Sequence, residues 1–176
     1  YVAACGALTD RLRVLLADAA GDPAGLARTS ATMRDLVEGV RLPDDLRDAV
    51  AGAYADLCRR CGTEDVPVAV RSSAVGEDAP EASFAGEHDT YLWVRGAAEV
   101  LSAVRRCWAS LFTERAMGYR ARLTPAADAG DGTGSAMGVA VQQMVLAEVA
   151  GVAFTFFPKN GAPSEIAIDG SWGFGE

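Results

Sequence analysis

Hydrophobic residues in the first third of the chain recur every three or four positions, which is the spacing of amphipathic helices. This pattern runs through residues 8–16, 33–40 and 46–57. Gly21-Asp22-Pro23 interrupts it after the first stretch, and Pro43 is suited to the start of a helix before the third. The spacing therefore predicts that residues 1 to about 61 are helical.

Short apolar runs replace the helical spacing from residue 66 onward, which indicates β-strands. We expect strands at residues 66–70, 90–94, 138–146, 151–157 and 165–168. Helical spacing returns over residues 97–122, which we expect to form one or two helices. The pattern as a whole predicts an α/β (α+β) fold, with a helical N-terminal third followed by a mixed β-sheet with helices.

Two segments between these elements have the composition of loops. Residues 72–87 are rich in Ser, Gly, Ala, Pro and acidic residues, and a loop of this length within a domain is usually functional. Residues 124–138 are the best candidate for a flexible surface segment, because the stretch 130–135 has almost nothing to bury. Asn160-Gly161 is a strong turn signal between the last two strands.

Length and charge limit the classes of partner. The 176 residues are enough for one domain or two small lobes, and the formal net charge is −8. This charge argues against nucleic-acid binding, which needs clustered Lys and Arg. No stretch approaches the length of a membrane-spanning helix and no secretory pattern opens the chain, so we expect a cytoplasmic protein without a membrane partner. Because Tyr1 stands where Met would begin a protein, we expect the chain to be a fragment of a longer one.

Four cysteines raise the question of a metal or redox site, because Cys58 and Cys61 form a CxxC pair. A zinc site would need two more ligands at compatible spacing, and the single histidine, His88, lies far along the chain. We therefore interpret the pair as reduced cysteines at the end of a helix in a cytosolic protein. A helical domain with a metal or redox site at this pair is the alternative.

The first segment whose residues could form a binding or catalytic site is the apolar run that ends in Arg71-Ser72-Ser73. A strand that ends in this way places a guanidinium and two hydroxyls at the start of a loop, which suits phosphate oxygens. Small residues in the following loop let backbone N–H groups approach an anion. The alternative is an ordinary loop in which Arg71 pairs with Glu77 or Asp78.

Two further segments are compatible with a nucleotide. An apolar strand that contains Gln142 and Met144 could offer backbone groups to a flat heterocycle while the methionine packs on its face. Taken without context, a core strand is the better interpretation of this segment. The glycine-rich end, residues 172–176, permits close backbone contact, and its carboxylate at Glu176 could bind a ribose hydroxyl or face a metal. A plain turn is the alternative there.

Taken together, these segments resemble the N-terminal nucleotide-binding domain shared by phosphoenolpyruvate synthase, pyruvate phosphate dikinase and rifampin phosphotransferase. The motifs occur in the same order as in that family: Val68-Ala69-Val70-Arg71-Ser72-Ser73-Ala74, Glu77-Asp78, Ala82-Ser83-Phe84-Ala85-Gly86, Asp89-Thr90-Tyr91-Leu92, Val141-Gln142-Gln143-Met144-Val145, Gly151-Val152-Ala153-Phe154-Thr155 and Trp172-Gly173-Phe174-Gly175-Glu176. The resemblance covers the chain from about residue 66 to its end, and the helical first third fits it only loosely.

The resemblance implies a partial ATP-grasp domain, in which ATP lies in a cleft between two lobes. Arg71 would then be the catalytic residue, binding ATP phosphates and stabilising charge on the transferred group. Gly86 and Thr90 would line the nucleotide pocket. Gln142 would lie on the adenine-side strand, Met144 and Val145 would make hinge contacts, and Glu176 would approach the ribose or the far wall of the cleft.

The chain also departs from the family's pattern. Val75 stands where Thr is usual and Glu87 where Gln is usual, and Glu87 adds negative charge near a phosphate site. The family's phosphate-binding lysine would lie upstream of Tyr1, and its magnesium ligands downstream of Glu176. We therefore expect no metal ligand within this chain, and we expect the isolated chain to be inactive. His88 lies inside the nucleotide loop and is a poor candidate for the phosphorylated histidine.

The resemblance assigns a role to each segment of the chain. Residues 1–65 would form a helical part of the N-terminal lobe, 66–123 the phosphate segment, 124–137 a flexible loop, and 138–176 the adenine side. ATP with Mg²⁺ would phosphorylate a histidine on another domain of the parent protein. That histidine would pass the group to an acceptor-binding domain holding pyruvate, an antibiotic, a phenol or another small acceptor. The alternative is a non-catalytic module that keeps the fold.

Overall fold

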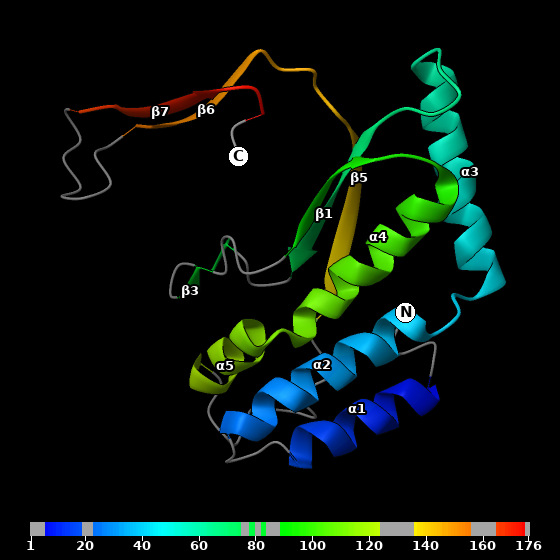
Figure 1. The fold of residues 1–176 in the computed structure, drawn as a ribbon, viewed down its shortest axis with the longest axis vertical. Coiled ribbons are helices and arrows are strands. Elements are labelled where there is room, and N and C mark those ends of the chain that lie inside the picture. The colour runs from blue at the N-terminus through cyan, green and yellow to red at the C-terminus, as the bar shows by residue number, and fades with distance from the viewer. Residues whose placement is uncertain are drawn as a thin grey trace. The chain divides into compact units, whose positions relative to one another are not determined.

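Three helices form the first third of the chain, as the hydrophobic spacing predicts. They are α1 (Gly6–Asp18), α2 (Pro23–Gly39) and α3 (Asp44–Arg60), shown in Figure 1. The computed structural model describes residues 6–18, 23–74, 78–79, 82–83, 89–123, 136–155 and 165–174. Pro43 precedes α3 with a φ of −51°, so its ring already holds the backbone near the helical value. None of the helices within these ranges is long and apolar enough to cross a membrane.

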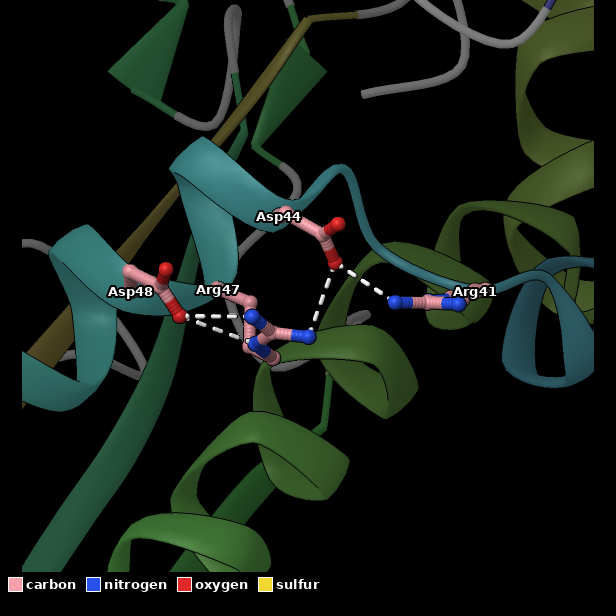
Figure 2. Close-up of polar contacts among 4 residues, drawn as sticks. All are labelled: Arg41, Asp44, Arg47 and Asp48. Carbon is pink, nitrogen blue, oxygen red and sulfur yellow. Dashed lines mark hydrogen bonds and ion pairs between the residues drawn. The ribbon is translucent and has the colours of Figure 1, made fainter.

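The start of α3 carries a chain of surface ion pairs, drawn in Figure 2. Asp44 Oδ1 accepts hydrogen bonds from Arg41 at 2.7 Å and from Arg47 at 2.8 Å, and Arg47 also bonds Asp48. The hydrogen bond and the charge of Arg41, followed by the charge of Arg47, hold the pKa of the Asp44 carboxyl below its usual value. All four side chains are largely in water, so these pairs add little stability and do not form a binding site.

The main sheet has three strands in the order β4-β1-β5 and is antiparallel throughout. Its strands are β1 (Val68–Ala74), β4 (Thr90–Val94) and β5 (Met137–Gln143). The hydrophobic pattern predicts a mixed sheet, whereas the strand pairs that the structure describes are all antiparallel. The expected strand at 138–146 corresponds to β5 but ends at Gln143, and the expected strand at 66–70 begins and ends later, as β1.

The prediction that Arg71-Ser72-Ser73 opens a loop is wrong. Strand β1 continues to Ala74, because β5 pairs with every residue from Val68 to Ala74 and extends the hydrogen-bonded ladder past Arg71. The expected loop at 72–87 also contains two short paired strands, β2 (Asp78–Ala79) and β3 (Ala82–Ser83). The flexible segment expected at 124–138 lies outside the described residues up to position 135.

Two hydrophobic clusters stabilise the residues before Met144. In the first, α4 (Ala97–Ala109) packs on one face of the sheet and contacts α3 (Figure 1). In the second, α1 and α2 pack against the 3₁₀ turn η1 (Ser110–Phe112) and α5 (Glu114–Leu123). Trp108 contacts both clusters, so its ring belongs to the core of this part of the chain.

A buried tyrosine joins three separate elements at one end of the sheet. The Tyr54 hydroxyl, from α3, lies 2.7 Å from Asp65 Oδ1 and 2.9 Å from the Val66 carbonyl oxygen. The Gly96 N–H, at the start of α4, donates to the same hydroxyl at 3.0 Å and to Asp65 Oδ1 at 2.6 Å. Gly96 has a φ of +80°, which favours glycine at this turn. Burial, followed by the Asp65 hydrogen bond, raises the pKa of Tyr54.

Residues 144–176 form a second compact unit, separate from residues 1–143. It contains the hairpin of β6 (Val149–Phe154) and β7 (Ala167–Trp172), close to the strands predicted there. Gly151 faces Gly170, and the backbone of Asp169 comes so close that no side chain fits at position 151. Several large apolar side chains of this hairpin are exposed, with Trp172 at 87%. A two-stranded ladder is only marginally stable in water, so this unit depends on further packing.

The thiols differ sharply in their surroundings, which leads to a test of reactivity. Cys58, Cys61 and Cys107 are free; Cys61 is half-buried, whereas Cys58 and Cys107 are buried. Burial, followed by the Asp89 charge, raises the pKa of Cys107 to about 12. Because the thiolate is the reactive form, we expect Cys107 to remain unmodified by iodoacetamide at pH 8 in the folded chain. Peptide mapping should find Cys61 labelled before Cys107, and equal labelling of Cys61 and Cys107 in the folded protein would contradict this.

Candidate nucleotide-binding site

The three-stranded sheet has one covered and one open face, set by the alternation of side chains along β1. Val68 and Val70 are fully buried against α4, whereas Arg71 and Ser73 are exposed. Successive residues of a strand point to opposite faces, so Arg71 and Ser73 belong to the face away from α4. We call this surface the open face of the sheet.

Arg71 and Thr90 lie beside each other on the open face. They are direct partners in the β1–β4 ladder, and both are exposed. Directly opposed residues have Cβ atoms about 5 Å apart and project to the same side. Among the carboxylates whose side chains the structure describes, none forms an ion pair with Arg71. The alternative partners Glu77 and Asp78 lie outside the described side chains. The Arg71 guanidinium is exposed on this side of the sheet, where an anion could reach it.

Gln142 reaches the same open face from β5. It pairs with Ala69, while Ala140 pairs with Arg71, so Gln142 and Arg71 are diagonal neighbours. Diagonal positions lie about 7–8 Å apart at Cα, within reach of long side chains. Between them, Ala140 is exposed, whereas Ala69 is buried, so the open face is covered at that position. The adjacent Gln143 is engaged elsewhere, because the Cys61 thiol donates to its Oε1 at 3.2 Å.

The strand pairs of the sheet do not include the other predicted nucleotide residues. Met144 and Val145 follow β5 and begin the second unit, where Val145 is 72% exposed. Gly86 and Glu176 lie outside the described residues, as do Val75, Glu87 and His88. The structure thus brings together Arg71, Thr90 and Gln142, which are far apart in the sequence.

Ser72 does not share the open face with Arg71, contrary to the idea that both serines point to phosphate. The strand alternation turns it to the other side, where its hydroxyl donates to the Asp89 carbonyl oxygen at 3.2 Å. Ser73 keeps an exposed position on the open face. The period of two along β1 could have separated these hydroxyls, but only if the strand had been predicted to continue past Arg71.

Sequence reasoning missed a group of residues on the covered side, directly behind Arg71 and Thr90. The Tyr91 hydroxyl donates to Asp89 Oδ2 at 3.0 Å, and the Arg106 guanidinium carbon lies 4.2 Å from the centre of the Tyr91 ring. The Cys107 thiol lies 3.8 Å from the carbonyl oxygens of both Asp89 and Val70. Burial, followed by the charge of Asp89, raises the pKa of Tyr91, so its hydroxyl stays protonated as a donor. The Asp89-Thr90-Tyr91-Leu92 motif contains two members of this group and is the signal in the sequence that could have pointed to it.

The described ranges contain no group of three His, Cys, Asp or Glu side chains that could hold a metal ion. They do include a shallow surface depression on α3, lined by Ala53, Asp56, Arg59 and Arg60. Arg59 is occupied there by an ion pair with Asp56. None of the predicted nucleotide residues lines this depression, so it is not the nucleotide site.

The whole chain, residues 1–176, matches the protein family described as "Pyruvate phosphate dikinase, AMP/ATP-binding domain". The chain belongs to this family. The match includes the helical first third, which the motifs alone related only loosely to it. An α/β fragment of a nucleotide-binding domain, as the sequence predicts, is therefore confirmed.

Relatives with different named functions share this domain. A protein of Methanothermobacter thermautotrophicus named "Probable phosphoenolpyruvate synthase" is 48% identical over 155 residues, covering 88% of this chain and 22% of that protein. One of the same name from Methanocaldococcus jannaschii is 44% identical, covering 96% of this chain and 14% of that protein. A "Rifampicin phosphotransferase" of a Streptomyces species is 44% identical, covering 89% and 17%. The chain thus spans less than a quarter of the length of these relatives.

Proposed function

We propose that the chain is the ATP-binding part of a longer phosphotransferase. In this proposal ATP phosphorylates a histidine on another domain, and that histidine passes the phosphoryl group to pyruvate or another small acceptor. Family membership supports the nucleotide, and the names of the relatives support the class of reaction. Free thiols at Cys58, Cys61 and Cys107, together with the use of ATP, favour a cytoplasmic location.

The observation that carries this proposal is the position of Arg71 on the open face. An exposed guanidinium held by a rigid central strand, without a carboxylate partner among the described residues, can bind two phosphate oxygens at once. Thr90 beside it can donate a hydroxyl hydrogen bond to the same phosphates. Gln142 on the neighbouring strand would lie on the adenine side of the nucleotide. Met144 and Val145, which follow in the chain, would make hinge contacts with the adenine.

Phosphoryl transfer also needs a metal ion and more positive charge than this surface offers. A triphosphate carries about four negative charges and is normally neutralised by Mg²⁺ and several cations. The described residues do not provide a set of magnesium ligands. We therefore propose that the magnesium ligands and a phosphate-binding lysine come from other parts of the longer protein, and that Gly86 and Glu176 complete the pocket. Residues 66–123 would supply the phosphate contacts and 138–176 the adenine side.

The test of the proposed function uses the longer protein and ATP labelled at each phosphate in turn. We expect covalent transfer of one labelled phosphoryl group to the protein. Phosphohistidine is lost in acid and stable in base, which distinguishes it from a phosphorylated serine or threonine. Acid-stable label would assign another residue type, and absence of any label with protein that binds ATP would favour a non-catalytic module.

The isolated 176-residue chain provides a second prediction. We expect calorimetry to detect only weak ATP binding, or none, because one open arginine cannot offset the charge of a triphosphate. The longer protein serves as the positive control in the same buffer with Mg²⁺. Micromolar affinity of the isolated chain would mean that the residues described here make most of the binding contacts.

A further inference from the structure

The pairing of Arg71 with Thr90 is the last registered pair at one end of the short β1–β4 ladder. Towards the other end the ladder is irregular, because Leu92 and Trp93 both lie opposite Ala69 between the Val68–Val94 and Val70–Tyr91 pairs. Trp93 has a φ of 59°, as expected for the extra residue of a bulge. Since β4 is also an edge strand among the described elements, few backbone bonds fix Thr90 beside Arg71. The end of such a ladder opens easily unless other contacts hold it.

Side chains supply those contacts from the covered side of the sheet. Asp89 directly precedes Thr90, and its carbonyl oxygen accepts the hydrogen bond of Ser72, which directly follows Arg71. The Asp89 carboxylate accepts the Tyr91 hydroxyl, so the two neighbours of Thr90 are tied to each other across it. These bonds fix the strand on both sides of Thr90.

Helix α4 anchors this bonded group to the core. Arg106 stacks over the Tyr91 ring at 4.2 Å, which limits the rotation of that ring. The next residue, Cys107, lies 3.8 Å from the carbonyl oxygens of Val70 and Asp89, one on each strand. Val70 precedes Arg71, and Asp89 precedes Thr90. One turn of α4 therefore contacts the backbone directly before each of the two open-face residues.

From this arrangement we infer that Asp89 and Tyr91 are positioning residues for nucleotide phosphates, acting through Arg71 and Thr90. Neither side chain lies on the open face, so neither contacts the nucleotide. The Tyr91–Asp89 bond keeps Thr90 in register opposite Arg71, so that both donors meet one phosphate group together. This inference rests on the proposed function, because it assigns these residues to the same phosphate site.

A double-mutant cycle in the longer protein tests the inference. We expect Tyr91→Phe, which deletes only the hydroxyl, to weaken binding of a non-hydrolysable ATP analogue about five- to tenfold. In an Arg71→Ala background the same change should have a clearly smaller effect, because Thr90 alone then remains to be positioned against the phosphate. A purely structural role would produce equal losses in both backgrounds. Asp89→Ala removes the same bond from its other side and should reproduce the pattern.

Tyr54→Phe is the matched control, because it also deletes a tyrosine hydroxyl bonded to an aspartate, but at the Asp65–Gly96 junction. It should lower the melting temperature without changing affinity for the analogue. If Arg71→Ala alone leaves affinity unchanged, the proposed phosphate site is wrong and the inference falls with it. If Arg71→Ala weakens binding while Tyr91→Phe and Asp89→Ala do not, or act additively with it, only the positioning inference is overturned.

Discussion

Replacing Arg71 by alanine in the longer protein is expected to lower ATP-dependent phosphorylation of the protein by about a hundredfold or more. The reason is that a donor fork fixed on a central strand stabilises negative charge on the transferred group without reorganising. Arg71→Lys keeps the charge but loses the planar fork, so it should recover only part of the rate. Single-turnover measurements at saturating ATP separate this effect on the rate from an effect on binding.

The same variant should remain folded, because the Arg71 side chain is exposed and contributes nothing to the two hydrophobic clusters. A change of about 0.5 kcal/mol or less in the free energy of unfolding is expected at such a surface position. Arg60→Ala, at an exposed arginine in the last turn of α3, is the matched control and should leave both rate and stability unchanged. Near-normal phosphorylation by Arg71→Ala would remove Arg71 from the mechanism.

The helices were predictable from sequence because each has a long periodic pattern of apolar residues, and these residues pack into a buried cluster. Met33 and Val37 on α2 are fully buried, as the spacing of four residues requires. The ends of the strands were harder to predict. Arg71, Ser72 and Ser73 have the composition of a loop, yet β5 pairs with all of them, and a partner 65 to 69 residues away in the sequence leaves no local signal.

The candidate site was predictable only in part, for a related reason. Motifs identified Arg71, Thr90 and Gln142 one by one, but only the register of the sheet places them on one face. The residues behind them include Tyr91 and Cys107. From its residue type and its apolar sequence neighbours, each of the two would be assigned to the core. The contacts of Cys107 with Asp89 and of Arg106 with Tyr91 arise because α4 packs against the strands at this point, which no local pattern encodes.

Arg71 and the residues behind it on the covered face have different roles at this end of the sheet. The open face keeps a guanidinium and a hydroxyl in water, where they can meet a phosphate, while the covered face uses its own polar groups to hold the strands in register. Binding groups need a rigid support more than they need further contacts of their own. If the proposed phosphate site is right, the register of β4 against β1 is the structural property on which its geometry depends.

Phe112→Ala is expected to lower the free energy of unfolding of the residues before Met144 by about 3–5 kcal/mol. Phe112 is 2% exposed and lies in the cluster where η1 and α5 meet α1 and α2. Its carbonyl oxygen accepts the Ser30 hydroxyl at 2.7 Å, and the substitution keeps that backbone bond. The decrease in the free energy of unfolding therefore measures the contribution of the Phe112 ring alone. Urea denaturation of the 176-residue chain, followed by circular dichroism at 222 nm, measures it through the helices.

Phe154→Ala makes the same chemical change in β6, where the ring is 42% exposed. All helices of the described residues lie before Met144, in the other compact unit, so this variant should leave the helical transition almost unchanged. Equal losses in the two variants would mean that the hairpin and the helices unfold as one cooperative body. A loss below about 1 kcal/mol for Phe112→Ala would instead mean that the cluster collapses into the cavity, and that η1 does not anchor the helical layer.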